Sequence, residues 1–503
     1  MNQLKAGVVL NYAIIVLNIL VGLIYTPYML RTMGQSEYGL YSLVASVISY
    51  LTILDLGFGN AVIRYTAKFR AEGKQTEQYE MFGMFLILYT IIGIIAFVAG
   101  SVLYIHVDSI FGNTMSAYEL DRARIMMSLM IFNVAVTFPF SIFGSIITAY
   151  ENFVFAKSIN IIRIILNTVV MICLLSMGYK AVAMVVVQTI FNLATLIINF
   201  LYCRYKLHIK IIFRRFKWQF LKEVAIYSFW IFLNIILDRV YWSSGQFILG
   251  AVVGTASVAV FAIAVHLAQM FMSFSTAISG VFLPKVTAMV ARNDNKKEIS
   301  DLFIRTGRIQ YTVLSIILFG FITFGKSFIN LWAGAEYIEA YIVCLLFFVA
   351  LFVPMIQNVG IAILQARDKM MFRSLIYVVI ALVSIVFQIV LAQKYGIVGC
   401  AIAVAGALII GQGIVMNVYY FKKQDIDIVN FWKEILKMSI VSIAVTIIFL
   451  ILINNYNIDS WGELLCGILF YCAIYIPLFW KFSMNKDEQN LLITPIKKVF
   501  KLN

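Results

Sequence analysis

Charged side chains stand inside several of the longest apolar stretches of this chain. The clearest pair is Asp238 and Arg239, which interrupt the apolar residues 223–250. A charge in hydrocarbon is costly unless it is paired or hydrated, so such residues are candidates for ion or substrate binding. Arg239 lies about 22 Å along a helix that begins near Val224, which is too deep for its guanidinium to reach the inner surface easily. The pair indicates either a polar or anionic ligand or a structural ion pair.

Uncharged polar residues recur at helical spacing in other apolar stretches. Asn18 belongs to a seven-residue repeat in the first stretch, and Asn234 lies four residues before Asp238. His266 and Gln269 share one helical face farther along the chain. Such stripes are expected along a hydrated cavity, although Asn and Gln also join transmembrane helices by hydrogen bonds. The helix-joining role is the stronger expectation for a third stripe, Gln188, Asn192 and Asn199.

Two further arginines lie at or inside membrane-length stretches. Arg64 follows Asp55 and the glycines Gly57 and Gly59, which are expected to loosen the end of the second stretch. Arg64 could meet an anionic headgroup at the cytoplasmic mouth, or it could be an ordinary basic residue at the membrane edge. Arg163 lies about one and a half turns into the fifth stretch, so its side chain can reach the surface.

Long apolar helices are needed to position these side chains. The chain has 503 residues, of which 62% are hydrophobic and only 13% charged. This composition excludes an ordinary soluble enzyme, a disordered protein and a secreted disulfide scaffold. Strand alternation is absent, so we expect an all-α integral membrane protein. Fourteen transmembrane helices are predicted, at residues 6–30, 39–63, 81–105, 125–149, 158–178, 181–203, 223–250, 255–284, 309–329, 341–364, 374–393, 396–421, 438–454 and 462–480.

The distribution of lysine and arginine predicts the topology. With the N-terminus inside, 31 of the 39 basic residues fall in inside segments and six in outside segments. This bias predicts that both termini are cytoplasmic. The net charge of +15 is therefore cytoplasmic loop charge, which needs no nucleic acid to explain it. Part of it could hold anionic lipid headgroups.

An internal repeat predicts the domain organisation. Residues 139–182 resemble residues 354–400, and Asn18 matches Asn234, at offsets of 215 to 218 residues. Each copy holds six helices, which predicts two lobes related by a pseudo-two-fold axis along the membrane normal. The expected parts are an N-terminal lobe at 1–210, a C-terminal lobe at 211–423, and two extra helices with a cytoplasmic tail at 424–503.

Two sequence features could suggest a cofactor, namely a P-loop-like spacing and the six cysteines, but neither indicates one. Residues 320–327 fit the spacing of a phosphate-binding P-loop, but they close an apolar stretch that the charge bias places on the outer face. The six cysteines are scattered and form no metal-binding pattern. We therefore expect neither a nucleotide nor a metal cofactor.

Several segments resemble polysaccharide biosynthesis membrane proteins. They are Tyr25–Tyr41, Asp55–Gly59 with Arg64, Asn234–Arg239 and Leu331–Gly334. The resemblance covers nearly the whole chain and is to the O-antigen and capsule repeat-unit flippase branch of the multidrug/oligosaccharidyl-lipid/polysaccharide exporter superfamily. It implies a multi-pass protein of the bacterial inner or plasma membrane. That protein would carry undecaprenyl-pyrophosphate-linked repeat units to the outer leaflet by alternating access, without catalysis.

The resemblance also implies site residues and partners. A cationic cavity would place Arg64 and Arg239 at the substrate, with Arg163 as a weaker third. Proton or sodium coupling stays open, with Asp238 as a candidate. The implied partners are the lipid-linked glycan, anionic lipids, a polysaccharide polymerase and a chain-length regulator.

Three alternatives stay open at this point. Two share the fold: a cation-coupled multidrug exporter and a lipid II flippase. A membrane glycosyltransferase or polymerase would need catalytic carboxylates or a large outer loop, whereas the longest predicted outer loop is 106–124.

Overall fold

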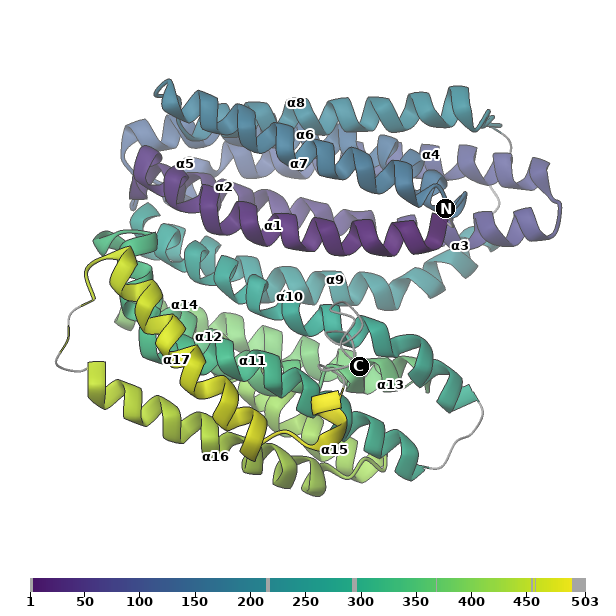
Figure 1. Ribbon diagram of the computed structural model, residues 1–503. Coiled ribbons are helices and arrows are strands. Elements are labelled where there is room, and N and C mark those ends of the chain that lie inside the picture. Colours follow the sequence, from purple (N-terminus) through teal and green to yellow (C-terminus); the bar gives the residue numbers. More distant parts are fainter. Residues whose placement is uncertain are drawn as a thin grey trace. The chain divides into compact units, whose positions relative to one another are not determined.

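The computed structural model describes residues 3–213, 218–291, 296–367, 369–453, 456 and 458–490. Some side chains within α1, α9 and α10 lie outside this description, among them that of the predicted site residue Asn234. Every regular element of the described residues is a helix (Figure 1). The predicted all-α membrane class is therefore confirmed.

Contacts along the chain divide it into two compact units. The first unit comprises Met1–Ala262 with Ile385–Cys400, and the second comprises Ile263–Ser384 with Ala401–Asn503. The helices of the first unit are α1 (Gln3–Met33), α2 (Gln35–Leu51), α3 (Phe58–Ala71), α4 (Gln75–Ile105), α5 (Val107–Phe111), α6 (Ala117–Ala149), α7 (Phe153–Ser176), α8 (Ala181–Leu201) and α9 (Trp218–Val252).

The remaining helices lie mainly in the second unit. Helix α10 (Thr255–Ala291) begins in the first unit, and α14 (Met370–Leu408) contributes to both units. The others are α11 (Lys296–Trp332), α12 (Ala340–Ile356), α13 (Val359–Ala366), α15 (Met416–Lys423), α16 (Ile428–Ile453) and α17 (Trp461–Phe482). Short π-helical segments, η2 (Tyr202–Lys206) and η4 (Ile409–Val415), extend α8 and α14.

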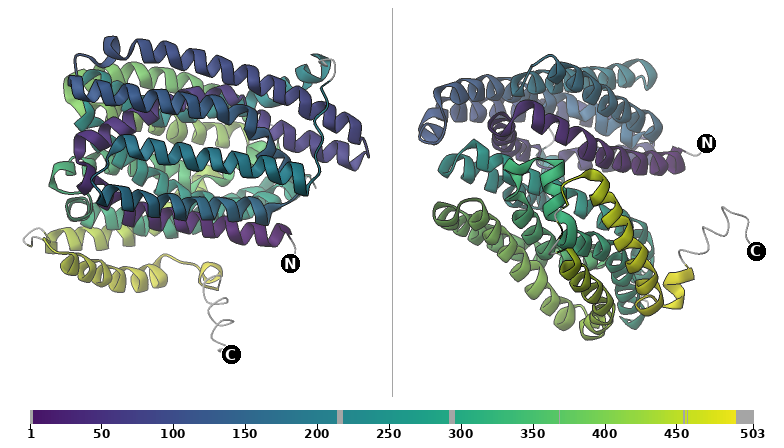
Figure 2. Two further views of the ribbon diagram at one scale, coloured as in Figure 1. Left: turned by 90° about the horizontal axis from the view of Figure 1, so that it is seen from above. Right: turned by 60° about the vertical axis from the view of Figure 1, so that its left-hand side comes forward.

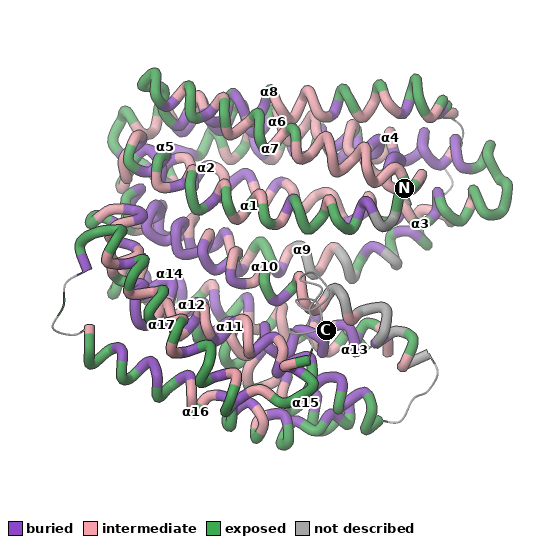
Figure 3. Tube along the Cα trace, in the orientation of Figure 1, coloured by how far each residue is buried: buried purple, intermediate pink, exposed green. Residues whose placement is uncertain are grey.

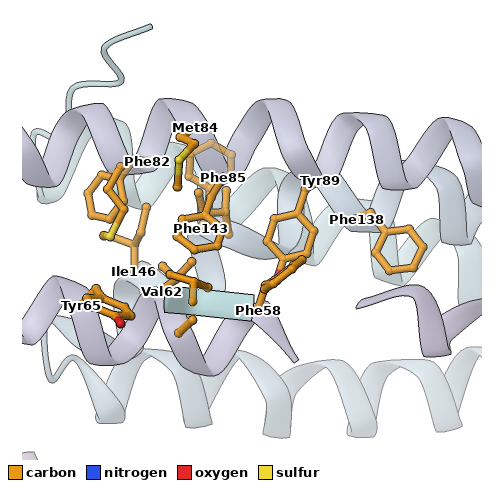
Figure 4. Close-up of a cluster of buried hydrophobic side chains, with 14 of the residues drawn as sticks. Phe58, Val62, Tyr65, Phe82, Met84, Phe85, Tyr89, Phe138, Phe143 and Ile146 are labelled. Atoms are coloured by element: carbon orange, nitrogen blue, oxygen red, sulfur yellow. The ribbon is translucent and has the colours of Figure 1, made fainter. Parts of the chain in front are cut away.

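The long helices of the first unit lie side by side. Helix α6 packs against α4 and α8, and α1 packs against α7 (Figures 1 and 2). The short helix α3 contacts α4 and α6, where aromatic and aliphatic side chains form a buried cluster (Figure 4). Phe58, at the start of α3, lies edge-on to Phe85 and Tyr89 of α4. This cluster fixes the place of the α2–α3 junction.

The second unit is organised around α11, which packs against α12, α16 and α17. Along α16, buried residues recur every three or four positions, while exposed aliphatic residues cover the other side (Figure 3). An exposed aliphatic face is expected where a helix borders lipid. Tyr311 of α11 and Tyr475 of α17 both contact the Ser442 hydroxyl of α16, at 3.4 and 2.8 Å.

The described residues contain eleven helices that are long and apolar enough to cross a membrane. The number is twelve if the bent pair Ala340–Ile356 and Val359–Ala366 counts as one span. One of the eleven, Met370–Lys423, joins two predicted spans across Gly396, whose φ of 58° is not helical. The count of fourteen and the cytoplasmic termini stay predictions.

The ends of helices repeat along the chain as the sequence pattern predicts. Three pairs of helix ends are each separated by 217 residues: Ala149 and Ala366, Phe153 and Met370, and Lys206 and Lys423. Gly178 follows the helix that begins at Phe153, and Gly396 interrupts the helix that begins at Met370. Both glycines have positive φ. These landmarks support the internal repeat, while the predicted domain boundaries and the pseudo-two-fold axis stay predictions.

Candidate functional site

The second predicted span is broken near its middle. Helix α2 ends at Leu51, a single 3₁₀ turn (η1, Thr52–Asp55) follows, and α3 starts at Phe58. Leu56 and Gly57 between them have φ of 53° and 71°. Left-handed backbone suits glycine but strains a residue with a side chain, so Leu56 is held there by its surroundings. The break interrupts the regular helix within a membrane-length segment, as in the discontinuous helices of transporters.

Asp55 stands at this break beside a buried tyrosine. Its carboxylate faces the hydroxyl of Tyr89 on α4 and the backbone N–H of Gly57. The Tyr89 side chain is fully buried, and its ring packs edge-on against Phe58 (Figure 4). Its hydroxyl makes no hydrogen bond of normal geometry to any described residue. An acid beside an incompletely paired hydroxyl can accept a proton, a small cation or a polar ligand group.

Three predicted site residues lie on the helices next to this break. Helix α9 packs along α2, η1 and α3. Asp238 and Arg239 are exposed on α9, and Arg64 is exposed on α3 with its guanidinium 5.9 Å from the Tyr65 ring centre. The structure therefore brings Arg64, Asp238 and Arg239 onto two neighbouring helices.

Two other predicted residues lie on a second pair of helices in the same unit. Asn18 is exposed on α1, and Arg163 is half-buried on α7, where it donates a hydrogen bond to Asn160 at 3.2 Å. Lys157 of α7 also donates to the side-chain oxygen of Asn11 on α1 at 2.8 Å. Asn11 lies seven residues before Asn18 in the polar stripe of α1, so part of that stripe joins helices.

The last two predicted residues lie on α10 in the second unit. Gln269 is exposed and His266 is half-buried. The Nε2 atom of His266 is itself buried and has no hydrogen-bond partner among the described residues. Asn234, the remaining candidate, lies outside the described side chains.

Two residues of the third polar stripe join helices, as expected from the sequence. Asn192 of α8 donates to both Asn133 and Thr137 of α6 at 2.7 Å. Gln188 of α8 donates to the Tyr41 hydroxyl of α2 at 2.6 Å. These hydrogen bonds join α8 to α6 and to α2.

Residues 34–41 form a motif within the segment Tyr25–Tyr41, which carries part of the family resemblance, and this motif has a structural role. Glu37 is buried, accepts a hydrogen bond from the Tyr118 hydroxyl at 3.1 Å, and lies 3.4 Å from the backbone N–H of Ala181. Gly39 lies so close to α10 that a Cβ atom there would stand 1.9 Å from the Thr255 carbonyl oxygen. The motif therefore ties the start of α2 to three other helix ends.

A second helix break, which the sequence analysis did not identify, lies in the second unit. Helices α12 and α13 meet at a 45° bend around Gln357 and Asn358. Asn358 donates to Ser275 and Ser279 of α10, each at 3.1 Å. Gln357 exchanges two hydrogen bonds with Asn417 of α15, at 2.8 and 3.1 Å.

A buried ion network in the second unit was also missed. Arg308 of α11 pairs with Glu488 through two hydrogen bonds, at 2.6 and 2.9 Å, and with Glu434 of α16 at 2.7 Å. The side chains of Arg308 and Glu488 are only 7% and 2% exposed. Arg308 lies just before the predicted span 309–329 and is therefore assigned to the cytoplasmic loop charges by the sequence. Its partners could not be identified from the sequence, because they lie 126 and 180 residues farther along the chain.

Comparison with known proteins gives a family and a fold. The sequence pattern of the polysaccharide biosynthesis protein family matches residues 4–290. The fold is similar to that of the lipid II flippase MurJ in an inward closed conformation, with a TM-score of 0.71 and 16% identity over 94% of this chain and 98% of that one. No curated protein matches the sequence.

Multidrug transporters share the same architecture. An inward-facing transporter of the MATE family and MOP superfamily aligns with a TM-score of 0.63 and 15% identity over 81% of this chain and 96% of that one. The MATE multidrug transporter DinF-BH aligns with a TM-score of 0.59 and 15% identity over 83% of this chain and 94% of that one. At 15–16% sequence identity, these similarities show that the proteins share a fold.

Proposed function

The chain belongs to the polysaccharide biosynthesis protein family, and we propose that it carries a lipid-linked sugar precursor across the membrane. The family match over residues 4–290, more than half of the chain, is the observation that carries the proposal. Its similarity in fold to a lipid II flippase supports a cargo that combines a lipid tail with a polar headgroup.

The proposed substrate is an oligosaccharide repeat unit linked to undecaprenyl pyrophosphate. The protein would move it from the cytoplasmic to the outer leaflet of the bacterial inner membrane, for assembly of a capsule or O-antigen by a polymerase and chain-length regulator. A pyrophosphate and several sugars cannot cross hydrocarbon unaided. Arg64 and Arg239, exposed on neighbouring helices, offer guanidinium groups suited to phosphate oxygens. The cycle would alternate access between the two sides without making or breaking a covalent bond.

Deletion of the gene tests the substrate. We expect undecaprenyl-linked repeat units to accumulate on the cytoplasmic leaflet and surface polysaccharide to be lost. The full-length protein should restore export, whereas Arg64→Ala and Arg239→Ala should not do so at equal protein levels. Arg204→Ala, which removes an exposed arginine from the end of the α8 segment, is the matched control. Normal surface polysaccharide in the deletion strain would overturn the proposal.

Lipid II is the second candidate substrate, because the MurJ fold aligns over 94% of this chain. The two candidates make opposite predictions in cells depleted of their own lipid II flippase. If this chain restores peptidoglycan synthesis there, lipid II is the better assignment. If it restores only surface polysaccharide in its own deletion strain, the repeat unit is the substrate.

A further inference from the structure

A groove in the second unit lies between the start of α14 and the α15 segment and encloses about 690 Å³. Phe372, Ile414 and Val418 contribute to its apolar wall. Lys369, just before α14, and Lys422 and Lys423, at the end of α15, lie at the same end of these two helices. The groove therefore combines an apolar length with a cationic end.

A distorted helix shapes this groove. Ile414 belongs to the π-helical segment η4, and π-helical turns often occur at functional sites. Gly411 in the same segment lies so close to α14 that a Cβ atom there would stand 2.3 Å from Ile380. Phe372 and Tyr419 stack with ring centres 4.0 Å apart. Close packing beside the π turn thus fixes the two walls.

The cationic end keeps an excess of positive charge. All three lysines are exposed, and in the described part of the chain none has a carboxylate within ion-pair distance. Asp425, the nearest acid in sequence to Lys423 that is described, is bound by Lys296 at 2.7 Å. That hydrogen bond also holds the pKa of Asp425 below its usual range. Asp425 is therefore already engaged by another cation.

We propose that this groove binds one anionic glycerophospholipid of the cytoplasmic leaflet. The phosphate would contact Lys369, Lys422 and Lys423, and an acyl chain would lie along the apolar wall. Basic pockets between helices at the cytoplasmic surface are suited to anionic headgroups, and long lysine stems can border an acyl chain while the ammonium groups reach the phosphate. The proposal does not depend on which substrate the protein transports.

Native mass spectrometry of the full chain in neutral detergent tests the charge requirement. We expect phosphatidylglycerol to be retained and phosphatidylcholine to be lost. The triple variant Lys369→Gln, Lys422→Gln, Lys423→Gln should bind phosphatidylglycerol about tenfold less. A matched triple variant, Lys206→Gln, Lys210→Gln, Lys222→Gln, removes three exposed lysines of the first unit and should bind it normally. Equal losses in both variants would overturn the proposal, because only overall charge would then matter.

A second variant tests the apolar wall without changing charge. Val418→Trp should fill the groove and reduce retained phosphatidylglycerol, whereas Ile443→Trp, at an exposed position of α16, should not. Unchanged binding of phosphatidylglycerol to Val418→Trp would overturn the proposal that the acyl chain lies along the apolar wall. Farnesyl pyrophosphate is the competing probe. If it binds the wild-type groove and phosphatidylglycerol does not, the occupant is an isoprenoid pyrophosphate and the phospholipid proposal is wrong.

Discussion

Each of the two units contains a break in a membrane-length helix. The two breaks differ in the hydrogen bonds that their polar side chains make. At the α12–α13 bend, Asn358 and Gln357 form hydrogen bonds with side chains of α10 and α15. At the α2–α3 break, Asp55 faces a tyrosine hydroxyl that lacks a partner of normal geometry among the described residues. Buried polar groups are nearly always satisfied, so an exception requires an explanation.

The difference extends beyond the breaks. The second unit buries an arginine with two carboxylates around it. The first unit instead exposes Arg64, Asp238 and Arg239 on the helices beside its break. We infer that the Arg308 network and the two amides at the α12–α13 bend hold helices of the second unit together. The better candidates for contact with a moving ligand or ion lie beside the break of the first unit: Asp55, Arg64, Asp238 and Arg239.

The largest effect on stability is expected from Arg308→Ala. It would leave the buried Glu488 carboxylate without its cation, at a cost of about 3–5 kcal/mol in the free energy of unfolding. The unfolding midpoint of the purified full chain in detergent measures this. Arg305→Ala, one turn earlier and exposed, is the control. Equal midpoints for the two variants would show that the network contributes nothing to stability.

A smaller effect is expected at the bend of the second unit. Asn358→Leu removes the donor to both Ser275 and Ser279, which should destabilise the protein by about 2 kcal/mol. Gln365→Leu changes an exposed amide on α13 and serves as the comparison in the same unfolding assay. If Asn358→Leu unfolds like the wild type, the bend is not held by these hydrogen bonds.

At the break of the first unit, backbone conformation should matter more than pairing. Gly57→Ala places a Cβ atom on a residue with φ of 71° and should cost about 1–2 kcal/mol. Gly320→Ala, in a helix where nothing lies within 4 Å of the added atom, should cost nothing measurable. A stable Gly57→Ala variant would mean that the break relaxes to another conformation.

The sequence predicted local features better than long-range pairs. Gly57 and Gly59 indicated a loosened helix because glycine tolerates left-handed backbone, and the break lies there. The Gln188 and Asn192 stripe indicated helix joining because amides inside a membrane need partners. Arg308 and Glu488 could not be paired in the same way, because they lie 180 residues apart and each resembles an ordinary cytoplasmic charge.

The smallest change in stability is expected for Asp55→Asn, and this variant tests the comparison of the two breaks most directly. The amide is nearly isosteric and removes a charge from a partly buried place, so the unfolding midpoint should not fall. Transport should nevertheless fall about tenfold if the carboxylate binds a proton or cation during the cycle. The binding of one ligand typically changes the affinity for a second, coupled ligand by about this factor. Surface polysaccharide in the complemented deletion strain measures transport, and Asp108→Asn, an exposed acid that pairs with Arg124, is the control. Full export by Asp55→Asn would mean that the first break is as purely structural as the second.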